Sequence, residues 1–517
     1  MSLRSTAPPI SSARNRRSYK RVLAVSAVAV LILLAVAAAL LAAKWPFTAG
    51  KIKAELGAAT SGSVEFQGFR VKYFPPGCVM EAVELRQTGN SNGTPLLTAA
   101  RLTVRANYRG LFRKRVEFMR LEDVHVSIGQ KVRSSKFGSA SDNGAQSATV
   151  AEIVIDRAVV EFPRKQKSPL QFKVHQLTFG NLVKGKPTSF HVTVDNPLPP
   201  GRIRADGQFG PLNMSDIAAT PLSGSYRFSD AKLSTLGGIA GTLSSQGSFG
   251  GPARALQVQG TTDTPDYEVK SAGHPVHLRT EFQAVVNCTN GDVNLQSIGG
   301  QFEKTAFGVA GNVAKKKAPS RVALLQVSDP GGRIEDWLRL LAPDQMPAMT
   351  GPIWFRAQVT IPGGARRFIQ RVRLSGDFGL ADVDFAKEKT KHEVRQLSLR
   401  AQGQKVPDAQ DEVLPKVTGR IAGHVELLDG VAHFSNLTYA LPGAMANLRG
   451  TYSFIDERID LHGDLAVETK FSATATGPKG LLTRAIEPLV AKARGKGEIL
   501  PVKLTGTYDH PSYGLDK

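Results

Sequence analysis

The hydrophobic positions of this chain follow two different patterns. Residues 22–43 (VLAVSAVAVLILLAVAAALLAA) contain no charged residue, amide or proline. A helix of this length, rising about 1.5 Å per residue, would span about 33 Å, which matches the hydrocarbon core of a bilayer. From residue 149 onward, apolar and polar residues alternate instead, as in TVAEIVIDRAVVEF and GRIRADGQF. This alternation predicts β-strands that each present one apolar face.

We interpret residues 22–43 as a single transmembrane anchor. Residues 1–21 carry six basic residues and no acid, so this tail is expected to stay in the cytoplasm while the rest of the chain is translocated. Trp45 and Phe47 suit the opposite membrane interface. The large apolar side chains expected to contact lipid are Val22, Leu23, Leu31, Ile32, Leu33, Leu34, Leu40 and Leu41.

A cleaved signal peptide is the alternative for the same segment. Ala37, Ala38 and Ala39 could form a cleavage site. However, the apolar run is longer than the roughly 7–15 residues usual for a signal peptide, which favours the uncleaved anchor.

Residues 48–130 predict a small α+β module. A short helix is expected over residues 48–60, and Phe66 and Val71 belong to a strand that is interrupted by a bulge at Gly68. Further strands are expected around 79–86 and 96–108, and a strand pair over 115–128. Residues 131–148 are polar and rich in Ser and Gly, which predicts a flexible linker.

The remainder divides into a first β region, residues 149–330, and a second, residues 331–517. Strands are predicted almost throughout, including VRQLSLRAQG at 394–403. Two helices are expected, at 333–341 and at 481–493. The second either binds a membrane through its apolar face or caps the end of a sheet.

Strands that each have one apolar face together form a large apolar surface, which must be buried against another part of the molecule or a ligand. About 28 strands are expected after residue 149, extending over about 130 Å, and two short helices cannot cover them. An open sheet longer than about ten strands tends to curl, which would leave an elongated apolar trough. Two sheets packed as a sandwich would show the same alternation. The expected fold class is mainly β: a long, curled, antiparallel-rich sheet behind a small α+β module.

Charge and cysteine content narrow the set of partners. The net charge is +22, with six of these charges on residues 1–21. Such a surface favours anionic lipid headgroups or acidic envelope polymers, whereas an anchored, translocated body argues against nucleic acid. The chain has only two cysteines, Cys78 and Cys288, which either pair or are simply small buried residues.

The sequence offers no motif for catalysis. A nucleophile elbow, a zinc-protease helix, a phosphate-binding glycine loop and a C-x-x-C pair are all missing. His274 and His277 lie in an expected turn without a nearby acidic ligand, and Asp382 and Asp384 are expected on one solvent-facing strand surface. We therefore expect no enzyme activity, no bound metal and no cofactor.

Several segments resemble a known family. The anchor followed by TSGSVEFQGFRVKYFPPG and TPLLTAARLTVRANYRGLFRKRVEF is similar to the start of AsmA-like bacterial envelope proteins, which are related to TamB. GHVELLDGVAHFSNLTYALPGAMANLRGTYSFIDERIDLHGDL and ILPVKLTGTYDHPSYGLD resemble the AsmA C-terminal region. The resemblance implies an inner-membrane anchor, a chorein-like N-terminal module and a periplasmic β-groove. It also implies a part in phospholipid movement or outer-membrane homeostasis.

The expected function is therefore phospholipid binding or conduction along a hydrophobic β-groove, with an envelope or outer-membrane protein as a further partner. The groove candidates are Phe66, Val71, Val425, Leu427, Phe434 and Leu437. A structural scaffold that binds acidic polymer is the alternative. A lipid-modifying enzyme is a third hypothesis, and it would need a polar pocket that the sequence does not display.

Overall fold

The computed structural model describes most of residues 62–516. The gaps within this range are 88–94, 96, 108–114, 128–148, 165–166, 183–184, 212–215, 289, 316–320, 342–345, 365, 405–416, 469–497 and 508–509. Of the first 61 residues, only 49, 50 and 53 are described.

Several predicted segments lie outside the described residues. These are the tail 1–21, the anchor 22–43 with Trp45 and Phe47, the linker 131–148, the helix 481–493 and most of the helix 48–60. Within the stretches of chain that are described, no helix is both long and apolar enough to cross a membrane.

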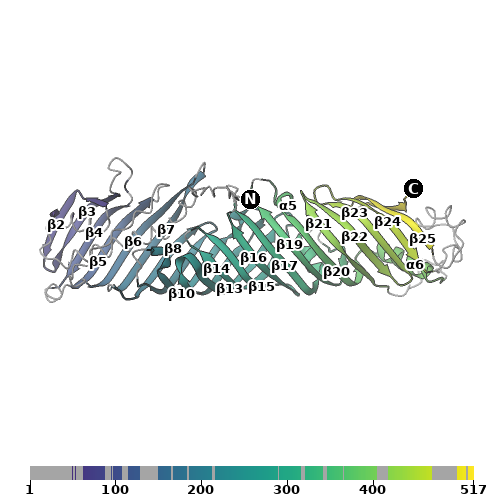
Figure 1. Cartoon of the computed structure of the whole chain (residues 1–517), viewed down its shortest axis with the longest axis horizontal. Coiled ribbons are helices and arrows are strands. Elements are labelled where there is room, and N and C mark those ends of the chain that lie inside the picture. The colour runs from purple at the N-terminus through teal and green to yellow at the C-terminus, as the bar shows by residue number, and fades with distance from the viewer. Residues whose placement is uncertain are drawn as a thin grey trace, which may run out of the picture.

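One elongated sheet of 26 strands makes up the described molecule (Figure 1). Its first strands are β1 (Gly62–Glu65), β2 (Gly68–Tyr73), β3 (Pro76–Gln87), β4 (Leu97–Ala106) and β5 (Arg115–Ser127). The middle of the sheet contains β6 (Thr149–Arg164), β7 (Lys167–Leu182), β8 (Thr188–Pro197), β9 (Pro200–Phe209), β10 (Pro221–Lys232), β11 (Ile239–Ala240), β12 (Thr242–Pro252), β13 (Leu256–Val269), β14 (Val276–Asn287), β15 (Asp292–Phe302), β16 (Thr305–Ala314) and β17 (Val322–Arg333). The last strands are β18 (Met349–Thr350), β19 (Pro352–Pro362), β20 (Arg373–Phe385), β21 (Gly419–Leu428), β22 (Val431–Leu441), β23 (Ala444–Ser453), β24 (Arg458–Val467), β25 (Glu498–Thr507) and β26 (Pro511–Leu515).

The helices are short and lie between strands. The described residues contain α4 (Ile334–Leu341), α5 (Phe368–Arg371) and α6 (Glu388–Ala401). Three 3-10 turns, η2 (Ile217–Ala219), η3 (Leu233–Leu236) and η4 (Ala253–Ala255), complete the described elements. The mainly β class is confirmed, as is the predicted helix at 333–341.

The strands follow one another across the sheet in nearly the order of the chain. Each pairs with its neighbour in an antiparallel sense, except that β5 and β6 are parallel. The strands run obliquely to the long axis, from β2 at one end to β25 at the other (Figure 1). From β3 to β26 the hydrogen-bonding direction covers about 100 Å, at about 4.8 Å per strand.

β1 and β2 are two pieces of one bent edge strand. Both pair with β3, β1 through Val64 opposite Leu85 and β2 through Val71 opposite Cys78. The break falls at residues 66–67, opposite Ala82, which has a φ of 50°. The predicted bulge therefore lies one residue before Gly68.

Three strand predictions were wrong. Residues 115–127 form the single strand β5, because the strand is not interrupted at Asp123, although the φ of this residue is 51°. Within the described residues after 149, β6 to β26 are fewer strands than the roughly 28 expected, since β6 and β7 each extend over 16 residues. Residues 394–403 belong largely to α6, because Val394 and Leu397 pack together on one helical face against the cluster that contains Leu441.

The burial of the sheet changes along its length. Near the N-terminal end a large cluster is closed to solvent, and Val116, Met119, Ile153 and Ile155 are each 0% exposed. From β8 onward most apolar side chains on the same face are only half-buried. The sheet thus combines a dry packed section with a longer section whose apolar face is partly open.

Candidate functional site: the apolar face of the sheet

The apolar residues of successive strands line up across the sheet. Because strand register is set by the backbone pairs, the side chains opposite one another form continuous rows. We define a first apolar row by the directly paired residues Phe69, Met80, Leu102, Leu121, Ile155, Leu177, Val192, Ala205, Tyr226, Gly247, Gly260, Phe282, Ile298, Val309, Val327, Ala357, Gly376, Val425, Phe434, Gly450, Leu461, Leu504 and Tyr513. This row crosses from β2 to β26 without a charged residue.

A second apolar row runs beside the first, two residues away along each strand except β15, where a bulge makes the separation three residues. Its members are Val71, Cys78, Val104, Met119, Ile153, Phe179, Phe190, Gly207, Gly224, Phe249, Val258, Ala284, Leu295, Gly311, Leu325, Val359, Leu374, Leu427, Ala432, Tyr452, Ile459, Gly506 and Pro511. The two rows together form what we call the apolar face.

Glycines in and beside these rows make space for aromatic rings. A Cβ atom on Gly224 would lie 2.9 Å from Cζ of Phe249, and one on Gly260 would lie 2.9 Å from the Tyr226 hydroxyl. The rings of Phe190 and Phe249 approach to 6.5 Å between centroids, although β9 and β10 separate their strands. The rings therefore lie along the sheet surface instead of standing upright on it.

Hydroxyl groups supply the polar side chains in the adjoining section of this face. Ser245, Thr262 and Thr280 are direct neighbours on β12, β13 and β14. The Tyr226 hydroxyl lies 3.1 Å from Ser245 Oγ, and the Thr262 and Thr280 hydroxyls are 2.8 Å apart. These hydroxyls satisfy one another and bring no charge to the apolar face.

α4 covers one edge of the apolar face. Trp337 packs edge-on against Phe302, at 4.9 Å between centroids, and against Phe355, at 5.1 Å. The buried Asp329 carboxylate accepts a hydrogen bond of 2.6 Å from the Trp337 indole nitrogen. A second buried carboxylate, Asp336, accepts a 2.8 Å bond from the Thr305 hydroxyl.

α5 lies at the opposite edge, where β19 ends and β20 begins. Phe368 and Ile369 pack against a buried cluster of Val372, Leu427 and Ala432, which Val425 and Phe434 also contact. Gly238, from the other edge between β10 and β12, approaches Phe368 so closely that a Cβ atom on it would lie 2.8 Å from Phe368 Cβ. The two edges of the sheet therefore touch at this point, which narrows the open section of the apolar face.

The opposite face of the sheet is polar and carries cross-strand ion pairs. Arg120 Nε lies 2.6 Å from an Asp156 oxygen, and His277 Nε2 lies 2.7 Å from an Asp263 oxygen. The hydrogen bond from His277, aided by Arg279, lowers the pKa of the Asp263 carboxyl below its usual range. Because these pairs are exposed, they keep this face soluble and add little stability.

The structure places all six predicted groove residues against apolar neighbours. Val425 and Phe434 are adjacent in the first row, and Val71 and Leu427 are in the second. The remaining two, Leu437 and Phe66, lie beside the rows: Leu437 pairs with Leu448, and Phe66 packs against the closed N-terminal cluster. Their contact with lipid stays a prediction. The sequence alone does not give the register of the strands. For this reason the glycines and alanines of the two rows were not predicted as part of the apolar face.

The structure also places the other candidates for chemistry. His277 has an acidic neighbour in Asp263, contrary to expectation, because the register of β13 and β14 pairs Asp263 with Arg279, which is two residues from His277 on the same face. Asp382 accepts a 3.3 Å bond from the Thr418 hydroxyl. Among the described residues, no group of three or more His, Cys, Asp or Glu could hold a metal ion.

Both cysteines are free thiols. Cys78 is buried in β3, and burial raises its pKa to about 12. Cys288 follows β14 and is half-buried, and burial raises its pKa as well. A raised pKa suppresses the thiolate, so both side chains behave as small apolar residues.

Comparison with protein-family models and with curated protein sequences found no match to this chain.

Proposed function

We propose that the apolar face binds the acyl chains of phospholipid, and that the protein moves or stores lipid in a bacterial envelope. The observation that carries the proposal is the pair of continuous apolar rows, most of whose members from β8 to β25 are half-buried. Over this section the rows extend for about 70 Å at about 4.8 Å per strand, which is several times the length of one acyl chain.

The surroundings of the rows support an apolar ligand. A half-buried apolar surface of this length is unfavourable in water, at about 25 cal/mol per Å², and a ligand that covers it would relieve that cost. The rings that lie over Gly224 and Gly260 keep the surface shallow enough for a flexible chain. No charged side chain interrupts either row, so an acyl chain would meet no unpaired charge.

The sequence supports a location at a membrane for this proposed activity. The apolar segment 22–43 with its basic flank would tether the sheet to the inner membrane, with the tail in the cytoplasm and the sheet in the periplasm. The resemblance to AsmA-like proteins supports the same location and the same lipid cargo. A partner protein in the outer membrane would receive the lipid.

The test is to purify the full chain from membranes and to quantify the phospholipid that copurifies. Phe282, in the first row on β14, is replaced by Glu, and its neighbour Gln283, on the polar face of the same strand, is replaced by Glu as a control. We expect wild type and Gln283→Glu to carry phospholipid, and Phe282→Glu to carry several-fold less. Circular dichroism checks that both variants fold. Lipid-free wild-type protein, or equal lipid in both variants, would contradict the proposal.

A further inference from the structure

The polar face of the sheet contains two adjoining hollows across β15 to β21. The larger has a volume of about 790 Å³ and the other about 700 Å³, and they share Gly308, Ser328, Arg356 and Asp377. Ser328, Arg356 and Asp377 are direct cross-strand neighbours on β17, β19 and β20. Their side chains alternate with Val327, Ala357 and Gly376 of the first apolar row, so the hollows lie on the other side of the sheet from the apolar face.

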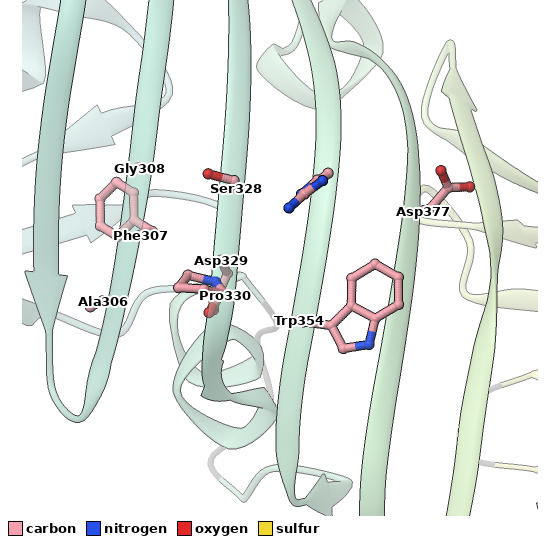
Figure 2. Close-up of a pocket in the computed structure, with 9 residues that line it drawn as sticks. Ala306, Phe307, Gly308, Ser328, Asp329, Pro330, Trp354 and Asp377 are labelled. Atoms are coloured by element: carbon pink, nitrogen blue, oxygen red, sulfur yellow. The ribbon is translucent and has the colours of Figure 1, made fainter.

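Trp354 forms one wall of the larger hollow (Figure 2). It is 47% exposed, which is unusual for so large an apolar side chain on a face that is mostly polar. A Cβ atom on the paired Gly379 would lie 2.4 Å from the Trp354 indole nitrogen. The indole therefore lies over Gly379 along the sheet, and Asp377 is on the same neighbouring strand, two residues from Gly379 (Figure 2).

The polar groups around this indole are largely uncommitted. Among the described residues, Arg356 makes no ion pair or hydrogen bond, although Asp377 is its register partner. Asp377 instead lies 2.7 Å from Nδ1 of His424. The second hollow is lined by Gln326 and Gln358, which are register partners on β17 and β19 and also make no side-chain hydrogen bond in the described stretches of the chain.

We propose that these hollows bind a saccharide chain that carries acidic groups. A solvent-facing indole is a stacking surface for the apolar face of a sugar ring, neutral amides and the Asp377 carboxylate can pair with hydroxyl groups, and the free guanidinium of Arg356 suits a carboxylate. Of the net charge of +22, six charges lie on residues 1–21, and the remaining +16 on the rest of the chain favours an anionic polymer over a neutral one. Acidic sugars are envelope components, so the second face of the sheet would contact the envelope while the first holds lipid.

The test measures binding of short oligogalacturonates to the full chain by titration calorimetry, with maltooligosaccharides of equal length as the neutral comparison. We expect saturable binding of the acidic sugar and much weaker binding of the neutral one. Trp354→Ala and Arg356→Gln should each lower the affinity at least tenfold, and Trp354→Phe should restore part of it. Arg449→Gln, which removes the same charge from the polar face of β23, should change the affinity less than twofold.

Other outcomes would overturn the proposal. Equal losses in Arg356→Gln and Arg449→Gln would show diffuse charge attraction without a site. Unchanged binding in Trp354→Ala, equal affinity for the neutral sugar, or no binding by wild type would each contradict it as well. The hollows and the apolar face lie on opposite sides of the sheet. The amount of copurified phospholipid should therefore be the same in Trp354→Ala and wild type. A failure of the saccharide proposal can thus be distinguished from a failure of the lipid proposal.

Discussion

At the scale of single residues, the apolar face depends on glycines that lie beside aromatic rings. A Cβ atom on Gly300 would lie 2.2 Å from the Phe307 ring, which is its register partner on β16. Phe307 in turn packs at 5.8 Å from Trp337 of α4. Because Gly300 has no side chain, the Phe307 ring can pack flat against the sheet, where it contacts Trp337 of α4.

Gly300→Ala should therefore destabilise the protein. The added methyl group forces the Phe307 ring out of its place, and overpacking of this kind costs about 1–3 kcal/mol. The neighbouring Gly299→Ala is the control, because a Cβ atom there meets nothing within 4 Å. It should be neutral or slightly stabilising, since alanine restricts the unfolded chain. Urea unfolding of both variants measures the difference, and equal midpoints would contradict this account.

His462 predicts a pH dependence at the C-terminal end of the sheet. Hydrogen bonds to Asp516, at 2.7 Å, and to Asp460, at 3.0 Å, raise the pKa of His462 above its ordinary value. A raised folded-state pKa means that the charged imidazole stabilises the fold fully below the unfolded pKa, near 6.5. This contribution is lost as the pH rises through the folded-state pKa.

We therefore expect His462→Gln to lower the melting temperature below pH about 6 and to have no effect at alkaline pH. The effect should be small and should shrink in salt, because the three side chains are exposed. Thermal unfolding of both proteins across this pH range measures it. A difference that grows with pH would contradict the assigned cause.

At the scale of elements, α4 is held over the apolar face by buried polar groups. Asp329, 1% exposed, accepts bonds from the backbone nitrogens of Gly331 and Gly332 and from Trp337. Asp329→Asn loses the charge and one acceptor, which should cost about 1.5–3 kcal/mol. Asp429→Asn, on an exposed turn, should stay within about 0.5 kcal/mol. Denaturant unfolding measures the free energy of unfolding of both variants. If Asp329→Asn leaves this free energy unchanged, packing alone holds α4 in place.

The elements also show how far the sequence could predict the fold. Alternation correctly predicted strands such as β6 and β9, because each has one apolar and one polar face. It failed at α6, where Val394, Leu397 and Leu399 fit both a strand and a helix. The hollows beside Trp354 were not predictable either, since they depend on the register that brings Arg356 next to Asp377.

At the scale of the whole molecule, the continuity of the two rows favours a single path for the proposed lipid ligand over a set of separate sites. Phe434, in the first row, lies on β22 near the C-terminal end of the sheet, several strands along the row from Phe282. If lipid moves along the rows, one charge at either position stops all movement past it, because a charged side chain on an apolar path is costly to pass.

Phe434→Arg should therefore lower the rate of phospholipid transfer between vesicles at least tenfold, while it removes only a fraction of the lipid that copurifies. The control is Ser435→Arg, which adds the same charge to the polar face of the same strand. Transfer is followed with a fluorescent phospholipid and the full chain reconstituted in donor vesicles. If Phe434→Arg transfers lipid as fast as Ser435→Arg, while Phe282→Glu still loses bound lipid, the apolar face holds lipid at separate sites and is not a path between membranes.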